Sequence, residues 1–167
     1  MGMLSRLRGL VRYALGQLKR PNMLKVGDTA PDFEVQDHTG KTVRLRELRG
    51  KRVVLFFYPK ADTPGCTKQS CGFRDRFPDY QKAGISVFGV SFDTVEENAA
   101  FAKKFGFAYP LLCDTKRELG LAYKTCDSAQ DPYSKRLTYV IGADGKIAQA
   151  IDTKDPAAQA ATLLAML

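Results

Sequence analysis

The chain has 167 residues, of which 44% are hydrophobic, and its formal net charge is +8 at pH 7. This length and apolar content suit one folded domain with its own core and exclude a disordered segment. Six of the positive charges fall in residues 1–25, which hold no acidic side chain, so the remainder is nearly balanced. The basic character belongs to one end of the chain, and we expect no nucleic-acid partner.

Residues 1–22 are predicted to be a basic amphipathic extension. Apolar side chains recur there at helical spacing, and arginine interrupts them every few positions. A helix of this kind would make weak contact with a membrane surface through residues 1–20. A frayed terminus and a start codon placed too early are the alternatives, because Met23 stands where an ordinary domain would begin.

The cysteine pattern and the hydropathy of the chain indicate the cellular compartment in which the protein works. Four cysteines at irregular spacing do not form the pattern of a secreted disulfide scaffold, which indicates a reducing compartment. No apolar run reaches membrane-spanning length, and the N-terminal arginines leave no clean apolar centre for a signal peptide. We therefore expect a cytoplasmic protein.

The predicted domain spans residues 23–167 and opens with a β-hairpin. Alternating side chains in residues 32–48 flank the turn sequence DHTGK, which is the pattern of two short strands. The run RVVLFFY at 52–58 is continuously apolar and rich in β-branched and aromatic residues. Such a run is typical of a central strand that is buried on both faces.

A helix at about 66–82 and a second buried strand at 84–93 follow this first strand. A strand–helix–strand unit implies that the two strands pair in parallel, with a right-handed crossover. Thr94 and Glu97 then have the spacing of a capping box at the start of a helix over 94–106.

The rest of the chain completes an alternating pattern. In chain order it holds a short apolar segment at 109–114, a short helix at 115–125, two antiparallel strands within 136–151 joined by a turn at Asp144-Gly145, and a helix over 155–167 with Pro156 at its start. This order predicts an α/β fold in which helices flank both faces of one central mixed β-sheet.

Cys66 is the candidate nucleophile, because it follows Pro64-Gly65 at the start of the predicted helix. The free N–H groups and partial positive charge of a helix N-terminus stabilise a thiolate, which is the reactive form of cysteine. Pro59 stiffens the preceding loop, and Thr63 can offer a hydroxyl to a polar substrate. A small buried core residue is the alternative, but the sequence TPGCT is not the apolar strand context that would favour it.

The sequence offers one candidate partner for this thiol. His38 is the only histidine and lies in the predicted hairpin turn, a typical solvated position that nothing connects with Cys66. A cysteine–histidine hydrolase or metal site is therefore unsupported. Arg136, which opens a predicted strand, would supply a permanent positive charge, although from sequence alone it is equally a surface arginine.

Several of these residues occur together in a known family. The sequence YPKADTPGCT at 58–67 resembles the Pro-x-x-x-Thr-x-x-Cys motif of peroxiredoxins, with Pro59, Thr63 and Cys66 at its three fixed positions. Cys71 resembles the resolving cysteine of the PrxQ (bacterioferritin-comigratory protein) subfamily. The segment RLTYVI, which begins at Arg136, is similar to the one that carries that subfamily's active-site arginine. The resemblance spans about residues 23–167.

The resemblance implies a thioredoxin-like fold with an N-terminal β-hairpin, and a thiol-dependent peroxidase. Hydrogen peroxide and alkyl hydroperoxides would be reduced by a peroxidatic Cys66, which then forms an intramolecular disulfide with Cys71. Thioredoxin or a similar dithiol would recycle the enzyme. No cofactor and no metal is expected, and the chain is expected to be a monomer or weak dimer.

Two cysteines lie outside this pattern, and two other functions remain as alternatives. Cys113 is interpreted as a buried structural residue, whereas Cys126 is either a bystander or an extra redox thiol. A thiol–disulfide exchange module would usually carry Cys-x-x-Cys, but four residues separate Cys66 from Cys71. A copper or zinc module built on these two thiols would lack supporting histidines.

Overall fold

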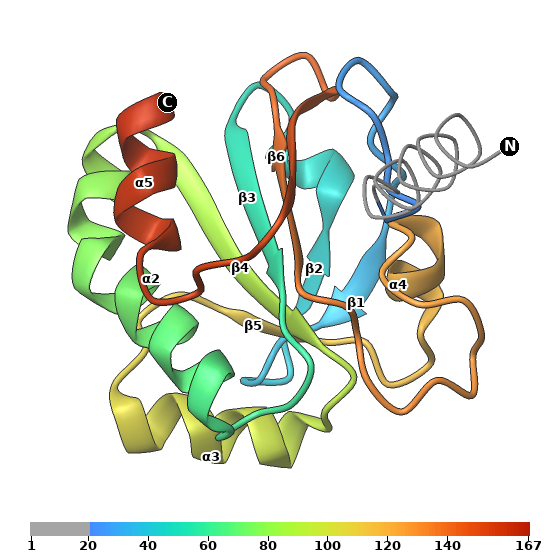
Figure 1. Ribbon diagram of the computed structural model, residues 1–167, viewed down its shortest axis with the longest axis vertical. Coiled ribbons are helices and arrows are strands. Elements are labelled where there is room, and N and C mark those ends of the chain that lie inside the picture. Colours follow the sequence, from blue (N-terminus) through green and yellow to red (C-terminus); the bar gives the residue numbers. More distant parts are fainter. Residues whose placement is uncertain (1–20) are drawn as a thin grey trace, which may run out of the picture.

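The computed structural model describes residues 21–167, so the predicted N-terminal helix lies outside the described residues. A five-stranded sheet with the strand order β5-β4-β3-β6-β7 forms the centre, and β1 and β2 form a separate two-stranded sheet (Figure 1). The elements are β1 (Glu34–Gln36), β2 (Thr42–Arg44), the 3-10 helix η1 (Leu45–Leu48), β3 (Arg52–Phe57), α2 (Pro64–Lys82), β4 (Ile85–Ser91), α3 (Val95–Phe105), β5 (Leu111–Cys113), α4 (Glu118–Ala122), β6 (Leu137–Ile141), β7 (Ile147–Asp152) and α5 (Gln159–Met166).

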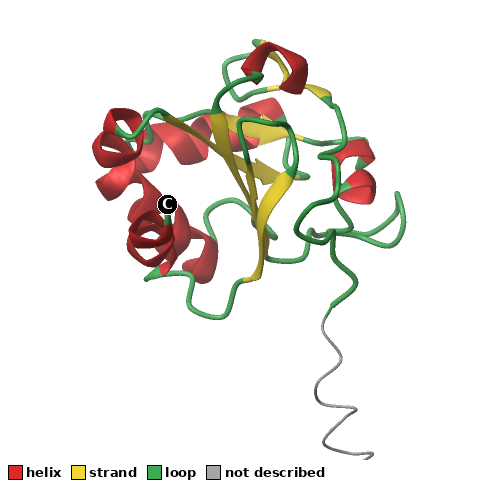
Figure 2. Ribbon diagram, turned by 90° about the horizontal axis from the view of Figure 1, so that it is seen from above, coloured by secondary structure: helices red, strands yellow, loops and turns green. Residues whose placement is uncertain are grey.

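Two apolar clusters cover the two faces of the central sheet. On one face, Val54 and Phe56 of β3 pack with side chains of α2, α3 and α5. On the other, Val53, Leu55 and Phe57 pack with α4 and with the β1–β2 hairpin. Figure 2 shows the sheet edge-on between these layers. Since successive side chains of a strand point to opposite faces and both faces are covered, residues 53–58 are apolar throughout, as predicted.

The strand pairings agree with the predicted connections. β3 pairs in parallel with β4, and β6 pairs antiparallel with both β3 and β7. Helix α3 begins with the predicted capping box, in which the Glu97 N–H donates to the Thr94 hydroxyl at 3.2 Å. It ends at Gly106, whose φ of 70° places it in the left-handed region that glycine adopts easily.

Three details differ from the sequence prediction. The apolar segment at 109–114 contains a strand, β5, which pairs in parallel with β4 and extends the sheet. Three residues are too few for a periodic pattern, so the sequence did not indicate this strand. Helix α2 begins at Pro64, two residues early, because Thr63 is its N-cap. Helix α5 begins at Gln159 instead of Pro156, and turn residues occupy the interval.

His38 is not the solvated turn residue that the sequence suggested. It is half-buried between the hairpin turn and β5. The backbone N–H of Leu111 donates to the Nδ1 atom of the imidazole at 3.0 Å. The backbone N–H of His38 donates to the Leu111 carbonyl at 2.8 Å. Burial lowers the pKa of the imidazole, and the nearby charge of Asp37 opposes this effect only in part.

We expect this histidine to make the stability of the fold depend on pH. Because its pKa is lowered in the folded state, the unfolded chain binds the proton more readily, so the free energy of unfolding falls as the pH drops below about 6.5. The His38→Asn variant keeps an acceptor near the Nδ1 position but does not titrate. Urea unfolding at pH 7 and pH 5 should show a smaller loss for the variant than for the wild type. Equal losses would contradict this role.

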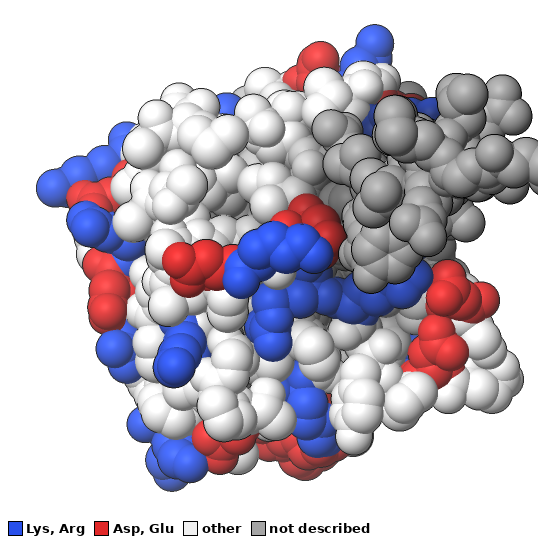
Figure 3. Space-filling model, in the orientation of Figure 1, with Lys and Arg blue, Asp and Glu red and all other residues white. Residues whose placement is uncertain are grey.

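Among residues 21–167, no helix has the length and apolar character needed to span a bilayer. On the face shown in Figure 3, acidic and basic side chains are interspersed, and the surface over α5 is uncharged.

Candidate active site

Cys66 lies in the first turn of α2, just beyond the carboxyl end of β3. The Thr67 N–H donates to the Thr63 carbonyl at 2.8 Å and closes this turn. The N–H groups of Gly65 and Cys66 precede the first helical hydrogen bonds and therefore point to where a ligand would sit. The Cys66 side chain is fully buried in the cluster between the sheet and α2.

Arg136 lies directly against this thiol. Its Nη2 atom donates to the Cys66 sulfur at 3.4 Å, and its Nη1 atom donates to the Gln69 Oε1 atom at 2.8 Å. Its carbonyl accepts a hydrogen bond from the Thr153 N–H at 3.1 Å, which fixes the backbone beside β7. The guanidinium is half-buried, so the structure places it in the site and not on the open surface that the sequence left as an alternative.

The loop before α2 is held in place by its own hydrogen bonds and by one buried carboxylate. The Thr63 hydroxyl donates to the Lys60 carbonyl at 2.7 Å. Asp93, which is almost fully buried, pairs with the Lys60 ammonium at 2.6 Å and accepts a hydrogen bond from the Ala61 N–H at 2.8 Å. Pro59 and Thr63 are both half-buried. The three motif residues are therefore held on one short, fixed stretch of chain.

Gly65 allows the arginine to approach. A Cβ atom built at this position would lie 3.0 Å from the Arg136 Nη2 atom, which is closer than ordinary contacts allow. The glycine is helical, so an alanine would suit the backbone and even favour the helix by about 0.5–1 kcal/mol. Only the end of the flexible Arg136 side chain would have to move.

For the reaction of Cys66 with peroxide that the resemblance implies, we expect Gly65→Ala to lower the rate about tenfold, because a displaced charge stabilises the reacting sulfur less well. Stability should be unchanged or slightly higher. Lys68→Ala, which changes an exposed side chain on the same part of α2, is the control. Competition kinetics for the reaction and urea unfolding for stability would test this. If Gly65→Ala also lowered the free energy of unfolding, the slower reaction would reflect damage to the helix and not a displaced arginine.

Cys71 lies on the same regular helix as Cys66, as predicted. Burial raises the pKa of its thiol, and Arg74 opposes this only in part. Five helical residues separate two Cα atoms by about 8–9 Å and turn their side chains about 140° apart. A disulfide needs Cα atoms within about 7 Å. All four cysteines are free thiols, and Cys66 and Cys71 cannot join while this part of α2 is folded.

The two other cysteines are buried away from solvent. Cys113 is in β5, where burial raises the pKa of its thiol to about 11, and the Asn98 side-chain amide donates to its sulfur at 3.4 Å. The prediction that Cys113 is buried is confirmed. Cys126 is buried against Gly120, and burial raises the pKa of its thiol as well. Its surroundings favour the bystander interpretation.

The sequence analysis missed two glutamines. Gln69 contacts Arg136, and Gln159 of α5 contacts Gln69 through a 2.6 Å hydrogen bond between their amides. Gln69 lies three residues after Cys66, so helical spacing alone places it near the thiol. Nothing in the local sequence marks Gln159, since its role depends on how α5 packs on α2.

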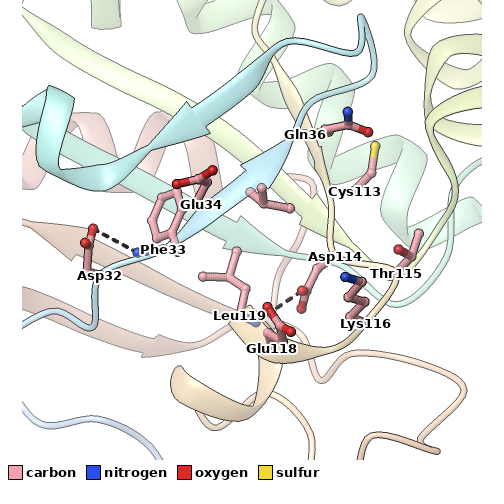
Figure 4. A pocket seen from close by; sticks show the side chains of 11 residues that line it. Asp32, Phe33, Glu34, Gln36, Cys113, Asp114, Thr115, Lys116, Glu118 and Leu119 are labelled. Atoms are coloured by element: carbon pink, nitrogen blue, oxygen red, sulfur yellow. Dashed lines mark hydrogen bonds between the residues drawn. The ribbon is translucent and has the colours of Figure 1, made fainter.

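The cavity in Figure 4 is separate from this site. It has a volume of about 440 Å³ and is lined by residues of β1 and of the segment from Cys113 to Leu119. In the close-up, the Asp114 carboxylate points to the start of α4, where it accepts hydrogen bonds from two N–H groups. Burial raises the pKa of this carboxyl to about 6. Neither Cys66 nor Arg136 lines the cavity.

Comparison with known proteins shows the family of the chain. The model of the AhpC/TSA family matches residues 26–150. Peroxiredoxin Bcp of Escherichia coli K12 is 39% identical over 141 residues, which cover 78% of this chain and 87% of the relative. The crystal structure of peroxidoxin BcpB from Mycobacterium tuberculosis is 39% identical with a TM-score of 0.79, and the match covers 85% of this chain and 95% of that one.

A third relative extends the comparison. The bacterioferritin comigratory protein of Xanthomonas campestris is 30% identical with a TM-score of 0.77, and the match covers 86% of this chain and 94% of that one. These neighbours have the thioredoxin-like fold that the sequence predicted. The chain belongs to the AhpC/TSA family, in which it is a peroxidase of the Bcp/PrxQ peroxiredoxins.

Proposed function

We propose that this peroxidase reduces hydrogen peroxide and alkyl hydroperoxides in a two-cysteine cycle. Cys66 is the peroxidatic thiol, Cys71 resolves it, and thioredoxin or a similar dithiol restores both. The observation that carries the proposal is the Arg136 guanidinium, which lies 3.4 Å from the Cys66 sulfur at the start of a helix. The Xanthomonas campestris relative is described as having alkyl peroxide reduction activity, which supports the substrate class.

In the first step the Cys66 thiolate attacks the terminal oxygen of the peroxide. An S–O bond forms, the O–O bond breaks, and the leaving oxygen takes up a proton to give water or an alcohol. The sulfur becomes a sulfenic acid. Negative charge develops on the leaving oxygen, where Arg136 and the N–H groups of Gly65 and Cys66 stabilise it.

Thr63 can orient the peroxide through its hydroxyl oxygen. Its hydroxyl proton is already donated to the Lys60 carbonyl, so its oxygen presents lone pairs. We infer that it accepts a hydrogen bond from the peroxide O–H. Arg136 donates a hydrogen bond to the peroxide, and Pro59 limits the entry of water. A donor from Arg136 and an acceptor from Thr63 match a hydroperoxide, R–O–O–H, which has one O–H to donate and oxygen lone pairs to accept.

In the second step the Cys71 thiolate attacks the sulfenic sulfur. An S–S bond forms, the S–O bond breaks, and hydroxide leaves and is protonated to water. Burial disfavours the Cys71 thiolate while α2 is folded. Opening of the first turns removes that burial and brings the sulfurs within bonding distance. A dithiol reductant then supplies two electrons and returns both thiols.

A coupled assay tests this cycle. Hydrogen peroxide or an alkyl hydroperoxide is added to the protein with thioredoxin, thioredoxin reductase and NADPH, and one NADPH should be consumed per peroxide. Mass mapping after one equivalent of peroxide without reductant should show a Cys66–Cys71 disulfide. A Cys66–Cys126 bond would remove Cys71 from its role. Oxidation of Cys66 without any NADPH consumption would mean that another reductant serves the enzyme.

A further inference from the structure

A chain of hydrogen bonds runs from the candidate active site to the C-terminal helix. Arg136 donates from Nη1 to the Gln69 Oε1 atom at 2.8 Å. The Gln69 Nε2 atom in turn donates to the Gln159 Oε1 atom at 2.6 Å. The first glutamine is fully buried and the second is 6% exposed, so water does not compete for these bonds.

Two threonines hold the far end of this chain. The Gln159 Nε2 atom donates to the Thr153 hydroxyl oxygen at 2.8 Å, and the Thr138 hydroxyl donates to the Gln159 Oε1 atom at 3.1 Å. The two hydroxyl oxygens are 3.4 Å apart. These three residues form a closed ring, since Thr153 can donate to Thr138, Thr138 to Gln159, and Gln159 to Thr153. Because both hydroxyls can donate and accept, the ring can also run in the opposite direction, so it holds the Gln159 side chain in place without choosing its orientation.

Arg136 determines which way both amides face, because a guanidinium group only donates. An amide has one acceptor end and one donor end. Gln69 must therefore turn its oxygen towards Arg136 and its nitrogen towards α5, where the Gln159 oxygen accepts from it. The reversed orientation would set two oxygens against each other at one end and two N–H donors at the other. Unpaired buried polar groups of this kind cost about 1–3 kcal/mol each.

We propose that Gln69, Gln159, Thr138 and Thr153 form an amide relay that positions Arg136 against the Cys66 sulfur. Gln159 is then a positioning residue for peroxide reduction, although it touches neither thiol. The relay is uncharged, and within residues 21–167 Arg136 has no ion pair with a carboxylate. Its full charge therefore stays available to the sulfur. The inference rests on the proposed role of Cys66.

The Gln159→Leu variant should expose this role. Without its partner in α5 the Gln69 amide can rotate, and Arg136 loses its fixed acceptor. We expect the second-order rate constant of Cys66 with hydrogen peroxide to fall about tenfold, and the pH–rate profile to move to higher pH. Gln159→Glu keeps an oxygen that accepts from Gln69 but adds a negative charge to the relay, so its rate constant should lie between those of the wild type and Gln159→Leu.

A double-mutant cycle separates the relay from a merely structural contact. If Gln159 acts only through Gln69, then Gln159→Leu has no further effect on the rate constant once Gln69 has been replaced by methionine. Leu163→Ala is the matched control, because it opens the packing of α5 without touching the relay. It should lower stability and leave the rate constant unchanged.

Each outcome decides between these accounts. Additive effects in the cycle, or a slowing by Leu163→Ala equal to that by Gln159→Leu, would overturn the relay. Circular dichroism at the assay temperature shows whether a variant is folded, and Gln159→Glu keeps the test valid if Gln159→Leu is not. If wild-type Cys66 itself fails to react with peroxide, the proposed function falls. If it reacts and the cycle is additive, only the relay falls.

Discussion

Replacing Cys66 with serine is expected to reduce peroxide consumption to the uncatalysed background. A serine hydroxyl does not ionise near neutral pH, even at a helix N-terminus beside an arginine, and it cannot form the sulfenic acid on which the cycle depends. The matched controls are Cys113→Ser and Cys126→Ser, which change buried thiols outside the site. Both should keep the wild-type rate in the coupled assay. Residual turnover by Cys66→Ser would show that another thiol is oxidised first.

The companion variant Cys71→Ser separates the two halves of the cycle. It should consume one equivalent of peroxide at the wild-type rate, since the groups around Cys66 are unchanged. Turnover with thioredoxin should then stop, because the sulfenic acid has no partner within reach. Mass spectrometry would find one added oxygen on Cys66 in place of a disulfide. Normal cycling by this variant would assign the resolving role to Cys126 or to an outside thiol.

Much of this site follows from local sequence. The loop TPGC places a thiol at a helix start whatever the surrounding fold, since proline and glycine end the strand and Thr63 begins the helix. The buried strand β3 was predicted for a similar reason, because its apolar run permits few other structures. His38 and β5 could not be predicted in this way. The burial of His38 depends on contact between the hairpin turn and a segment about seventy residues later, and β5 depends on its pairing with β4.

The position of Arg136 follows from topology and not from its neighbours in the sequence. β6 pairs antiparallel with β3, with Thr138 opposite Phe56. The residue that precedes β6 must therefore lie beside the carboxyl end of β3, where the loop to Cys66 begins. The sequence identified Arg136 only as a candidate cation. The pairing of β6 with β3 is what brings it next to the thiol. Gln159 needed one further step, the packing of α5 against α2, which no local pattern encodes.

Formation of the Cys66–Cys71 disulfide is expected to unwind the first turns of α2, around residues 65–72. The folded helix holds the two Cα atoms about 8–9 Å apart, beyond the reach of a disulfide. Gly65 and Gly72 bound this segment and lower the cost of leaving helical geometry. Unwinding also breaks the hydrogen bonds of Gln69 with Arg136 and Gln159, so the site that activates the thiolate is dismantled once it has reacted.

Amide hydrogen exchange measures this change directly. Residues 65–75 should be protected in the reduced protein and exchange fast in the disulfide form, whereas β3 and β4 stay protected in both. Cys71→Ser treated with one equivalent of peroxide is the control, because it carries an oxidised Cys66 but no disulfide. It should keep the protection of the reduced form. Equal protection of 65–75 in the reduced and the peroxide-oxidised wild-type protein would exclude a bond between these two cysteines, since the folded helix has no geometry in which they can meet.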